Sequence, residues 1–450
     1  MNKSERPLEF RALSERKTGW RIHTNSINQP VEMNLTVTSL LRRVLPLKGF
    51  CYREARWSQN EPKTIEIGIE ARKGSRPRCG CCRRKSSVYD TRREPRCWQF
   101  IPLWGILIFF VYAARRVNCK RCGVRVEHLP WASGKFRVCD ALRIFLAQWA
   151  RLLSWQDVAA RFGVSWADVY GSVKWVVKYG LRHRDLSGIS AVGVDEICVG
   201  RRKFWTVAYQ IDDGAKRLLW IGKDRTAKTL DVFFNRMGQE VCAGIVFICS
   251  DMWKAYLAVI ARRLPFALHI LDRFHIRRNL SDAVDEIRRA ETSAMARAGI
   301  SPLLKKMRWA LLKHRRNWTR KERSRMRELL ITGLHSIRAF LLVESFEHFW
   351  TYNSPTWAGK FLDAWCAKVA RSRLKPLKKV AASLKRHRQL LLNYFEAKML
   401  FSSGVVEGLN NKLKLTLKRA FGFRTDLARK VALYHALSKL PEPELTHSFF

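Results

Sequence analysis

Acidic residues are scarce in this sequence. Its 450 residues include 38 Asp and Glu against 85 Lys and Arg, which gives a formal net charge of +47. The excess is spread along the chain, so it is not a detachable basic tail. Such a balance, in a chain with 47% hydrophobic residues, predicts a globular protein that binds a polyanion, with nucleic acid as the leading candidate. Ribosomal or membrane-surface binding is the alternative interpretation.

Long apolar runs, a secretory signal and internal repeats are also missing. The most apolar stretch, residues 100–114, contains Pro102 and Gly105 and is too short and too broken to span a membrane. We interpret it as strands of a small domain. Because the N-terminus shows no recognisable signal, the 12 cysteines are expected to be thiols or metal ligands rather than disulfides.

Four of the cysteines form two C-x-x-C pairs, Cys79 with Cys82 and Cys119 with Cys122. Two such pairs, separated by about 36 residues of predicted β structure, suit a tetrahedral four-thiolate Zn²⁺ site of structural type. Cys81 is an alternative ligand in place of Cys79 or Cys82, and unconnected buried thiols are the alternative to a metal. Because the segment between the pairs offers little core of its own, we expect the metal to hold this domain together.

Residues 154–170 have the pattern of a helix-turn-helix. Gly163 falls in the predicted tight turn, and Ser165 is placed to cap the second helix, which we expect over about 165–178. In such units the second helix enters the major groove of DNA. The candidate DNA contacts here are Ser165, Ser172 and Lys174, with Ser172 and Lys174 expected to point outward.

The next region changes to strands and contains two acids with an unusual setting. Residues 192–199 form an apolar, β-branched run with Asp195 in its middle, and residues 245–249 form a second run that ends in Asp251. With predicted strands at 204–211, 217–221 and 267–271 and helices between, the pattern predicts a mixed sheet with helices on its faces. Acids that meet across such a sheet suit a hard divalent cation. Glu196 is the alternative to Asp195, since neighbours on a strand face opposite sides.

A site with two divalent ions needs a third carboxylate. Among the candidates, Glu407 stands out because it follows a glycine turn and opens a helix rich in Asn, Lys and Arg, which suits a phosphate backbone. The other candidates are Glu286, Glu344, Glu347 and Glu396. The predicted DNA contacts around Glu407 are Asn410, Asn411, Lys412, Lys414 and Arg424.

With these motifs, the chain resembles the DDE transposases of the ISL-three group of bacterial insertion sequences. The resemblance runs from about residue 33 to about 435 and is carried by Val194-Asp195-Glu196, by residues 250–256, 271–275, 406–411 and 420–424, and by the N-terminal stretches 116–122 and 128–131. It implies a ribonuclease-H-like catalytic fold with Asp195, Asp251 and Glu407 as the triad that binds two Mg²⁺ (or Mn²⁺) ions. Asp272 and His275, next to a predicted strand end, are candidates for groups that orient those ligands.

The resemblance also implies a function. A transposase of this kind binds the terminal inverted repeats of its element, cuts at the ends and joins the 3′-ends to target DNA. We expect a cytoplasmic protein of the bacterial nucleoid that acts on double-stranded DNA as a homo-oligomer and has no membrane partner. The alternatives are an inactive regulator built from the zinc and helix-turn-helix units, and a nuclease of the same fold that cuts without joining.

The expected fold class is therefore multidomain α/β. A ribonuclease-H-like mixed sheet with a large helical insertion is preceded by a zinc-binding β domain and a helix-turn-helix domain. The expected boundaries are 1–32 for a disordered segment or extension, 33–135 for the zinc domain, 136–188 for the helix-turn-helix, 189–435 for the catalytic domain with its insertion at about 274–400, and 436–450 for a C-terminal tail.

Overall fold

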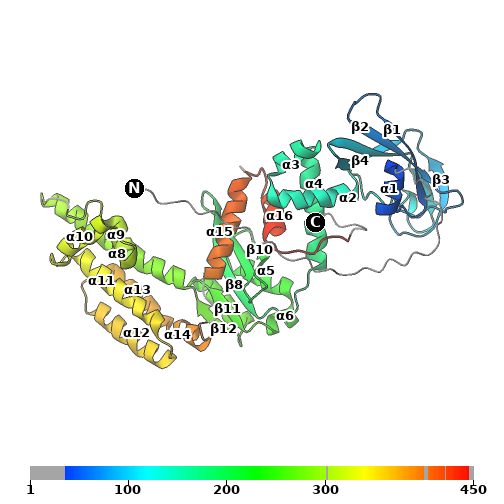
Figure 1. The fold of residues 1–450 in the computed structure, drawn as a ribbon. Helices are drawn as coiled ribbons and strands as arrows, with labels where there is room; N and C mark the ends of the chain where they lie inside the picture. Colours follow the sequence, from blue (N-terminus) through cyan, green and yellow to red (C-terminus); the bar gives the residue numbers. More distant parts are fainter. Residues whose placement is uncertain (1–35, 301–302, 400–403, 421, 445–450) are drawn as a thin grey trace, which may run out of the picture.

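The computed structural model describes residues 36–300, 303–399, 404–420 and 422–444. These residues form an elongated molecule in which four regions follow one another (Figure 1). A β region lies at one end, a group of three helices follows, a mixed sheet occupies the middle, and a block of helices forms the other end. The predicted disordered segment 1–32 lies outside the described residues.

The N-terminal region contains two sheets and one helix, α1 (Val37–Val44). The larger sheet has the order β1-β2-β5-β4, in which only β2 and β5 run parallel. The smaller sheet has the order β3-β6-β7 and is antiparallel throughout. The strands are β1 (Phe50–Trp57), β2 (Thr64–Ala71), β3 (Ser87–Thr91), β4 (Arg96–Leu103), β5 (Ile106–Tyr112), β6 (Arg115–Cys119) and β7 (Gly123–Val126).

This region has a substantial apolar core, contrary to the expectation from the sequence. Trp98, Phe110 and Trp131 are almost fully buried, and the ring of Trp131 meets Phe50, Trp98 and Tyr112 edge-on. Buried aromatic side chains of this size each remove about 150–250 Å² from water. The larger sheet therefore has its own source of stability, and the prediction that the segment between the cysteine pairs offers little core of its own is wrong.

Three helices follow: α2 (Asp140–Leu152), α3 (Trp155–Phe162) and α4 (Trp166–His183). Gly163 ends α3 in the left-handed conformation, with φ 62° and ψ 37°, which glycine adopts without a steric penalty. Ser165 then caps α4, and Asp168 completes a capping box with it. Val158 and Val169 are fully buried between these helices.

The central sheet has the order β10-β9-β8-β11-β12. The first three strands form an antiparallel meander, and β8, β11 and β12 run parallel. One face packs against α5 (Ala227–Met237) and α7 (Lys254–Arg263), with the short α6 (Gln239–Ala243) beside them, and the other face packs against α15 (Gly404–Arg419) and α16 (Asp426–Leu437). The strands are β8 (Ala191–Gly200), β9 (Lys203–Gln210), β10 (Arg217–Ile221), β11 (Phe247–Ser250) and β12 (Leu268–Leu271).

The block between β12 and α15 is helical, as the sequence predicted. One apolar core runs through it, and α14 packs against the edge strand β12, where the Asn393 amide donates a 2.7 Å hydrogen bond to the His269 carbonyl. Its helices are α8 (Arg273–Arg297), α9 (Arg308–Leu312), η1 (Arg315–Asn317), α10 (Arg320–Leu330), α11 (His335–Phe346), η2 (Glu347–Thr351), α12 (Pro355–Ala370), α13 (Lys375–Arg386) and α14 (Arg388–Glu396).

No single helix among the described residues has the length and apolar character that crossing a membrane requires. One pair, Arg320–Leu330 with His335–Thr351, meets that test only when the two are taken together across a bend of 114°. Their apolar side chains, including Met326, Phe340 and Phe346, belong to the buried core of the helical block.

The C-terminal residues connect two regions. Helix α16 packs against both α4 and β10, and Leu440 beyond it packs against α4 at Gly180. Glu442 pairs with Arg151 of α2 at 2.8 Å. The expected boundary between residues 435 and 436 thus falls inside α16, and the described part of the segment beyond it lies on the three-helix group.

Candidate active site and metal centre

Three neighbouring parallel strands place an aspartate at the same level of the central sheet. Extending the observed registers of β8, β11 and β12 by one or two residues aligns Asp195, Asp251 and Asp272. Asp195 lies within β8, whereas Asp251 and Asp272 directly follow the ends of β11 and β12. Asp195 and Asp251 are therefore neighbours across two adjacent strands, and Asp272 is the neighbour of Asp251 on the next strand.

Asp195 is buried and held by contacts to both carboxylate oxygens. The residue is 9% exposed. The Glu196 backbone N–H donates to Oδ1 at 2.7 Å, and the side-chain amide of Asn410 donates to Oδ2. Nε2 of His275 lies 3.5 Å from Oδ1. A buried carboxylate is costly unless it has such partners, and these contacts fix its orientation.

Asp251 is half-buried and accepts a 3.0 Å hydrogen bond from the Trp253 backbone N–H. Burial raises the pKa of the Asp251 carboxyl above its ordinary value, and the charges of Glu196 and Asp195 add to the rise, while the Trp253 N–H and His275 oppose it. Several carboxylates thus lie close together here, and among the described residues His275 is the one basic group that lowers the pKa of Asp251. Carboxylate oxygens are the donors that Mg²⁺ and Mn²⁺ prefer, so this part of the site suits a divalent cation.

Asp272 and His275 lie at the start of α8. Asp272 caps that helix by accepting a 2.7 Å hydrogen bond from the Phe274 N–H, and its carboxylate lies 3.8 Å from His275 Nε2. Burial alone would lower the pKa of His275, but the neighbouring Asp195, Asp272 and Asp251 raise it above its ordinary value. The imidazole therefore lies between two of the acids, within ion-pair distance of both when it is protonated.

Glu196 has a different role from Asp195. Its carboxylate pairs with Arg225 at 3.0 Å, and Arg225 in turn stacks over the rings of Phe204 and Trp253. Asp195, on the other side of the strand, meets Asn410 of α15. Of the two adjacent acids, Asp195 is therefore the one that faces α15.

Helix α15 crosses β8 in close contact. Val406 lies so near Gly193 that a Cβ atom at position 193 would come within 2.5 Å of its Cγ2. One turn further along, Asn410 reaches Asp195. Glu407, between these two residues in the sequence, is exposed. The chain thus returns to β8 after the helical block and carries Glu407 on the returning helix (Figure 1).

The other acids considered from the sequence lie within the helical block. Glu344 and Glu347 both pair with Arg277, at 3.9 Å for Glu344. Glu396 accepts a 3.1 Å hydrogen bond from Gln389, and Glu286 is exposed. Unlike Glu407, none of these four acids lies on the helix that packs against β8.

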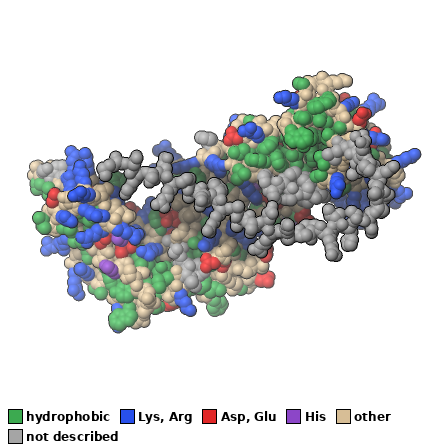
Figure 2. All heavy atoms as spheres, in the orientation of Figure 1, with side chains coloured by type: hydrophobic (Ala, Val, Ile, Leu, Met, Phe, Trp, Pro, Cys, Tyr) green, Lys and Arg blue, Asp and Glu red, His purple; other side chains and the backbone are tan. Residues whose placement is uncertain are grey.

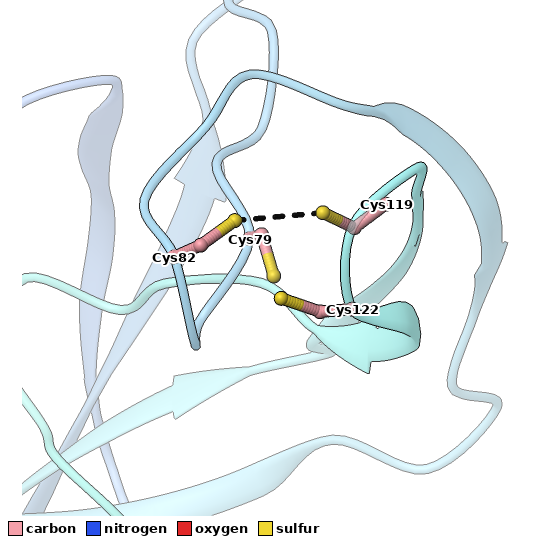
Figure 3. A group of neighbouring side chains, drawn as sticks. All are labelled: Cys79, Cys82, Cys119 and Cys122. Carbon is pink, nitrogen blue, oxygen red and sulfur yellow. Dashed lines mark hydrogen bonds between the residues drawn. The ribbon is translucent and has the colours of Figure 1, made fainter.

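The four predicted cysteine ligands converge. The sulfur atoms of Cys79, Cys82, Cys119 and Cys122 all lie within 4.8 Å of one another, and Figure 3 shows them facing each other from two turns. Cys81 is exposed and is not one of these four, although its side chain lies close enough to Cys122 to influence the pKa of that thiol. Within the described ranges, these four side chains are the one set of three or more Cys, His, Asp or Glu residues this close together.

The chemistry of the cluster suits a metal. Backbone N–H groups of Arg121 and Cys122 lower the pKa of Cys119 to about 6, whereas contact with Cys82 raises the pKa of Cys122 to about 12. Four thiolates at this spacing repel one another, so a cation is needed for all to ionise together. The cluster could hold a metal ion such as Zn²⁺.

Two of the predicted DNA contacts are wrong. Ser172 is fully buried, and its hydroxyl donates a 2.6 Å hydrogen bond to the Asp168 carbonyl one turn earlier in α4. Asn410 is 7% exposed, and its side-chain amide is hydrogen-bonded to Asp195 and Tyr209. In both cases a short polar side chain on the inner face of a helix was assigned to the outer face. The spacing of Asn410, three residues after Glu407, could have indicated that it faces the same site.

The remaining predicted contacts are accessible. The structure exposes Ser165, Lys174, Asn411, Lys412, Lys414 and Arg424. The hydroxyl of Ser165 is engaged with Asp168 in the helix cap. Lys174 lies 5.8 Å from the centre of the Tyr170 ring on the outer side of α4. Lys and Arg side chains are spread over the face drawn in Figure 2, in agreement with the large net charge.

Comparisons with known proteins identify the family of this chain. A family described as transposase, the DDE type of the ISL-three group, matches residues 192–427, which is more than half of the chain. The chain belongs to this family, and it is a transposase. Two relatives are the transposase for insertion sequence element IS1001 of Bordetella parapertussis and the transposase for insertion sequence element IS1557 of Mycobacterium tuberculosis.

Both relatives are similar over most of their length. The IS1001 transposase is 25% identical to this chain, and the matched region covers 84% of this chain and 92% of the IS1001 protein. The IS1557 transposase is 29% identical, and the matched region covers 78% of this chain and 83% of the IS1557 protein. The matched family segment begins at the second residue of β8 and ends inside α16, so it includes all three acids of the expected triad.

Proposed function

We propose that this transposase cuts and joins DNA at the ends of its insertion sequence with Asp195, Asp251 and Glu407 as the catalytic triad. The observation that carries the proposal is the convergence of α15 on β8, beside two aspartates at the same level of adjacent strands. The order β10-β9-β8-β11-β12, with a meander followed by two parallel strands, supports a ribonuclease-H-like catalytic fold with the helical block as an insertion.

Two divalent ions, Mg²⁺ or Mn²⁺, would be held by the three carboxylates and would activate the attacking water or 3′-hydroxyl and stabilise the leaving oxygen. The protein contributes orientation. Asn410 and the Glu196 N–H fix the Asp195 carboxylate, and His275 between Asp195 and Asp272 limits the repulsion among the acids. Exposure of Glu407 at the edge of the site leaves its carboxylate accessible to DNA and cations.

DNA binding is proposed to use several surfaces. Helices α3 and α4, joined by the turn at Gly163, support the assignment of a helix-turn-helix, in which α4 would read the terminal inverted repeats with Lys174 on its exposed side. Exposed Asn411, Lys412 and Lys414 on α15 would contact the phosphate backbone beside the active site. We propose that the protein acts as a homo-oligomer, since two ends of one element must be processed together.

The four-cysteine cluster is proposed to bind a structural Zn²⁺ ion. It joins the turn before β3 to the turn between β6 and β7. With Val117, the cysteines form a small cluster separate from the aromatic core of the larger sheet. The metal would therefore hold the smaller sheet and its two turns in place.

The decisive experiment is a strand-transfer assay with pre-cut element ends and a separate target duplex. The unmodified protein should join the 3′-ends in Mg²⁺ or Mn²⁺, which a nuclease that only cuts would not do. Asp195→Asn and Asp251→Asn should each abolish cleavage and joining while end binding persists in a gel-shift assay. Combining the two changes should add little, because members of one catalytic unit are not additive. Retention of activity in either variant would refute the assignment.

A further inference from the structure

Asn410 connects Asp195 to a buried tyrosine. Its Nδ2 donates to Asp195 Oδ2, and its Oδ1 accepts a 2.7 Å hydrogen bond from the Tyr209 hydroxyl. Tyr209 is fully buried in β9, next to the strand that carries Asp195. The three side chains therefore form a continuous chain of hydrogen bonds inside the site.

The order of donors and acceptors in this chain is fixed. Burial, and then the charge of Asp195, raise the pKa of the Tyr209 phenol far above its ordinary value, so the hydroxyl keeps its proton. The tyrosine donates that proton to the Asn410 oxygen, which turns the amide nitrogen toward the carboxylate. An amide in the opposite orientation would place an oxygen against Asp195 and repel it.

We propose that Tyr209 and Asn410 are positioning residues that fix the Asp195 carboxylate for a divalent cation. This inference rests on the proposed catalytic role of Asp195. The Glu196 N–H restrains one carboxylate oxygen and Asn410 restrains the other. Each ionised oxygen retains a lone pair for a cation. Partners of this kind behind metal ligands typically influence affinity or activity by about 10- to 100-fold.

The test compares Asn410→Leu, which keeps the branched shape of the side chain, with Tyr209→Phe and the control Asn235→Leu. The first readout is Mn²⁺ binding by calorimetry, and the second is the Mn²⁺ concentration that gives half-maximal cleavage. Asn410→Leu should raise that concentration by about 10- to 100-fold, and Tyr209→Phe should raise it less. Asn235 is exposed on α5, on the opposite face of the sheet from α15, so its replacement should leave both readouts unchanged.

Coupling distinguishes positioning from packing. In the Asn410→Leu background, Tyr209→Phe should have no further effect on the Mn²⁺ requirement, because the tyrosine acts through the amide. A variant that melts earlier but keeps the original Mn²⁺ requirement would show a purely structural role and overturn the proposal. Asp195→Asn is measured in parallel, since activity in that variant would instead refute the proposed catalytic function.

A second, independent observation lies in the helical block. A hollow of about 460 Å³ between η1 and α10 is lined by four arginines, Arg315, Arg316, Arg323 and Arg327. All four are exposed, and among the described residues the structure gives none of them an ion-pair partner. We call this feature the arginine hollow. Figure 2 shows Lys and Arg side chains gathered over this end of the molecule, where α8 and α10 lie.

Like charges that converge on a concave surface repel one another unless an anion joins them. Nearby basic residues show the contrast, since Lys313 pairs with Glu322 at 2.8 Å and Arg308 approaches Asp285 at 3.5 Å. One acid, Glu344, also lines the hollow, and its carboxylate lies 3.9 Å from Arg277. Guanidinium groups match phosphate oxygens in geometry and charge.

We infer that the arginine hollow binds the phosphodiester backbone of DNA that lies beyond the active site. The test replaces its four arginines with Gln and measures DNA affinity by fluorescence anisotropy across a range of salt concentrations. The slope of log affinity against log salt should fall by about 0.9 for each phosphate that the variant no longer neutralises. A control with the same change in charge replaces exposed Arg338, Lys360, Lys368 and Lys379 on other helices of the block.

Two duplexes identify the source of the phosphates. If the four-arginine variant binds more weakly only to a duplex that carries the element end and adjoining element sequence, the arginine hollow binds element DNA. If the variant binds more weakly only to an unrelated duplex, the hollow binds target DNA. An unchanged slope on both duplexes, or an equal fall in the control variant, would overturn the inference. Cleavage of end DNA at low salt and saturating protein should persist, which separates this result from failure of the catalytic proposal.

Discussion

The two candidate metal sites of this protein are built in different ways. The four cysteines come from two short turns, and their sulfurs already lie within 4.8 Å of one another. The acids come from β8, the end of β11 and a helix that begins after the whole helical block, so that Glu407 stands 156 positions after Asp251. Local spacing thus determines most of the first site, whereas the second exists only when the complete central region has folded.

The largest expected effect tests the acid site. Glu407→Gln keeps the size of the side chain but removes the charge, so cleavage and joining should fall by about three orders of magnitude or more, as when a member of a catalytic unit is removed. End binding should remain nearly intact, measured by gel shift. Glu396→Gln is the matched control, because Glu396 lies on α14 with Gln389 as its partner, and it should remain active. An active Glu407→Gln protein would assign the third acid elsewhere.

The difference between the two sites explains how far the sequence could be interpreted. Strand patterns and turn residues predicted the five strands of the central sheet, with Asp195 inside one of them and Asp251 just after another, because alternation and β-branched runs are local signals. The inner faces of helices were harder to assign. Ser172 and Asn410 are polar side chains, and only packing against neighbouring elements shows that both are buried. Likewise, the aromatic core around Trp131 gathers residues from distant strands that no short window contains.

The next prediction concerns the cysteine site. Cys119→Ser should abolish stoichiometric zinc, measured by metal analysis, and weaken DNA binding by about tenfold or more while the catalytic acids are unaffected, because the two turns are released when zinc is no longer coordinated. Hydrogen exchange should show reduced protection in β3, β6 and β7 but not in the larger sheet, which has its own aromatic core. Cys81→Ser is the control and should retain zinc, since Cys81 is exposed outside the cluster. If both sheets lost protection together, the smaller sheet would not be stabilised separately from the larger one, contrary to the proposal.

A smaller effect is expected where α15 meets β8. Gly193→Ala should destabilise the fold by about 1–3 kcal/mol, the usual range for overpacking, because the new methyl group would meet Val406 at 2.5 Å. Thermal unfolding measures the cost, and the cleavage rate shows whether α15 has shifted from Asp195. The same change in a Val406→Ala background should cost less, since the two residues share one contact. Equal costs in both backgrounds would mean that the helix does not approach the strand this closely.

The smallest expected effect concerns the exposed side of α4. Lys174→Gln should reduce the preference for element ends over unrelated DNA by about 1 kcal/mol, the lower end of the range for a base contact. Lys178 is also exposed and lies one turn further along the same helix, so Lys178→Gln is the matched control for a general decrease in charge. If α4 enters the major groove with Lys174 at the bases, only Lys174→Gln should change the ratio of specific to unrelated binding, whereas both variants should reduce the salt slope by at most about 0.9. Equal effects of the two changes on both measurements would mean that α4 contacts only phosphates, and that reading of the terminal repeats belongs to another surface.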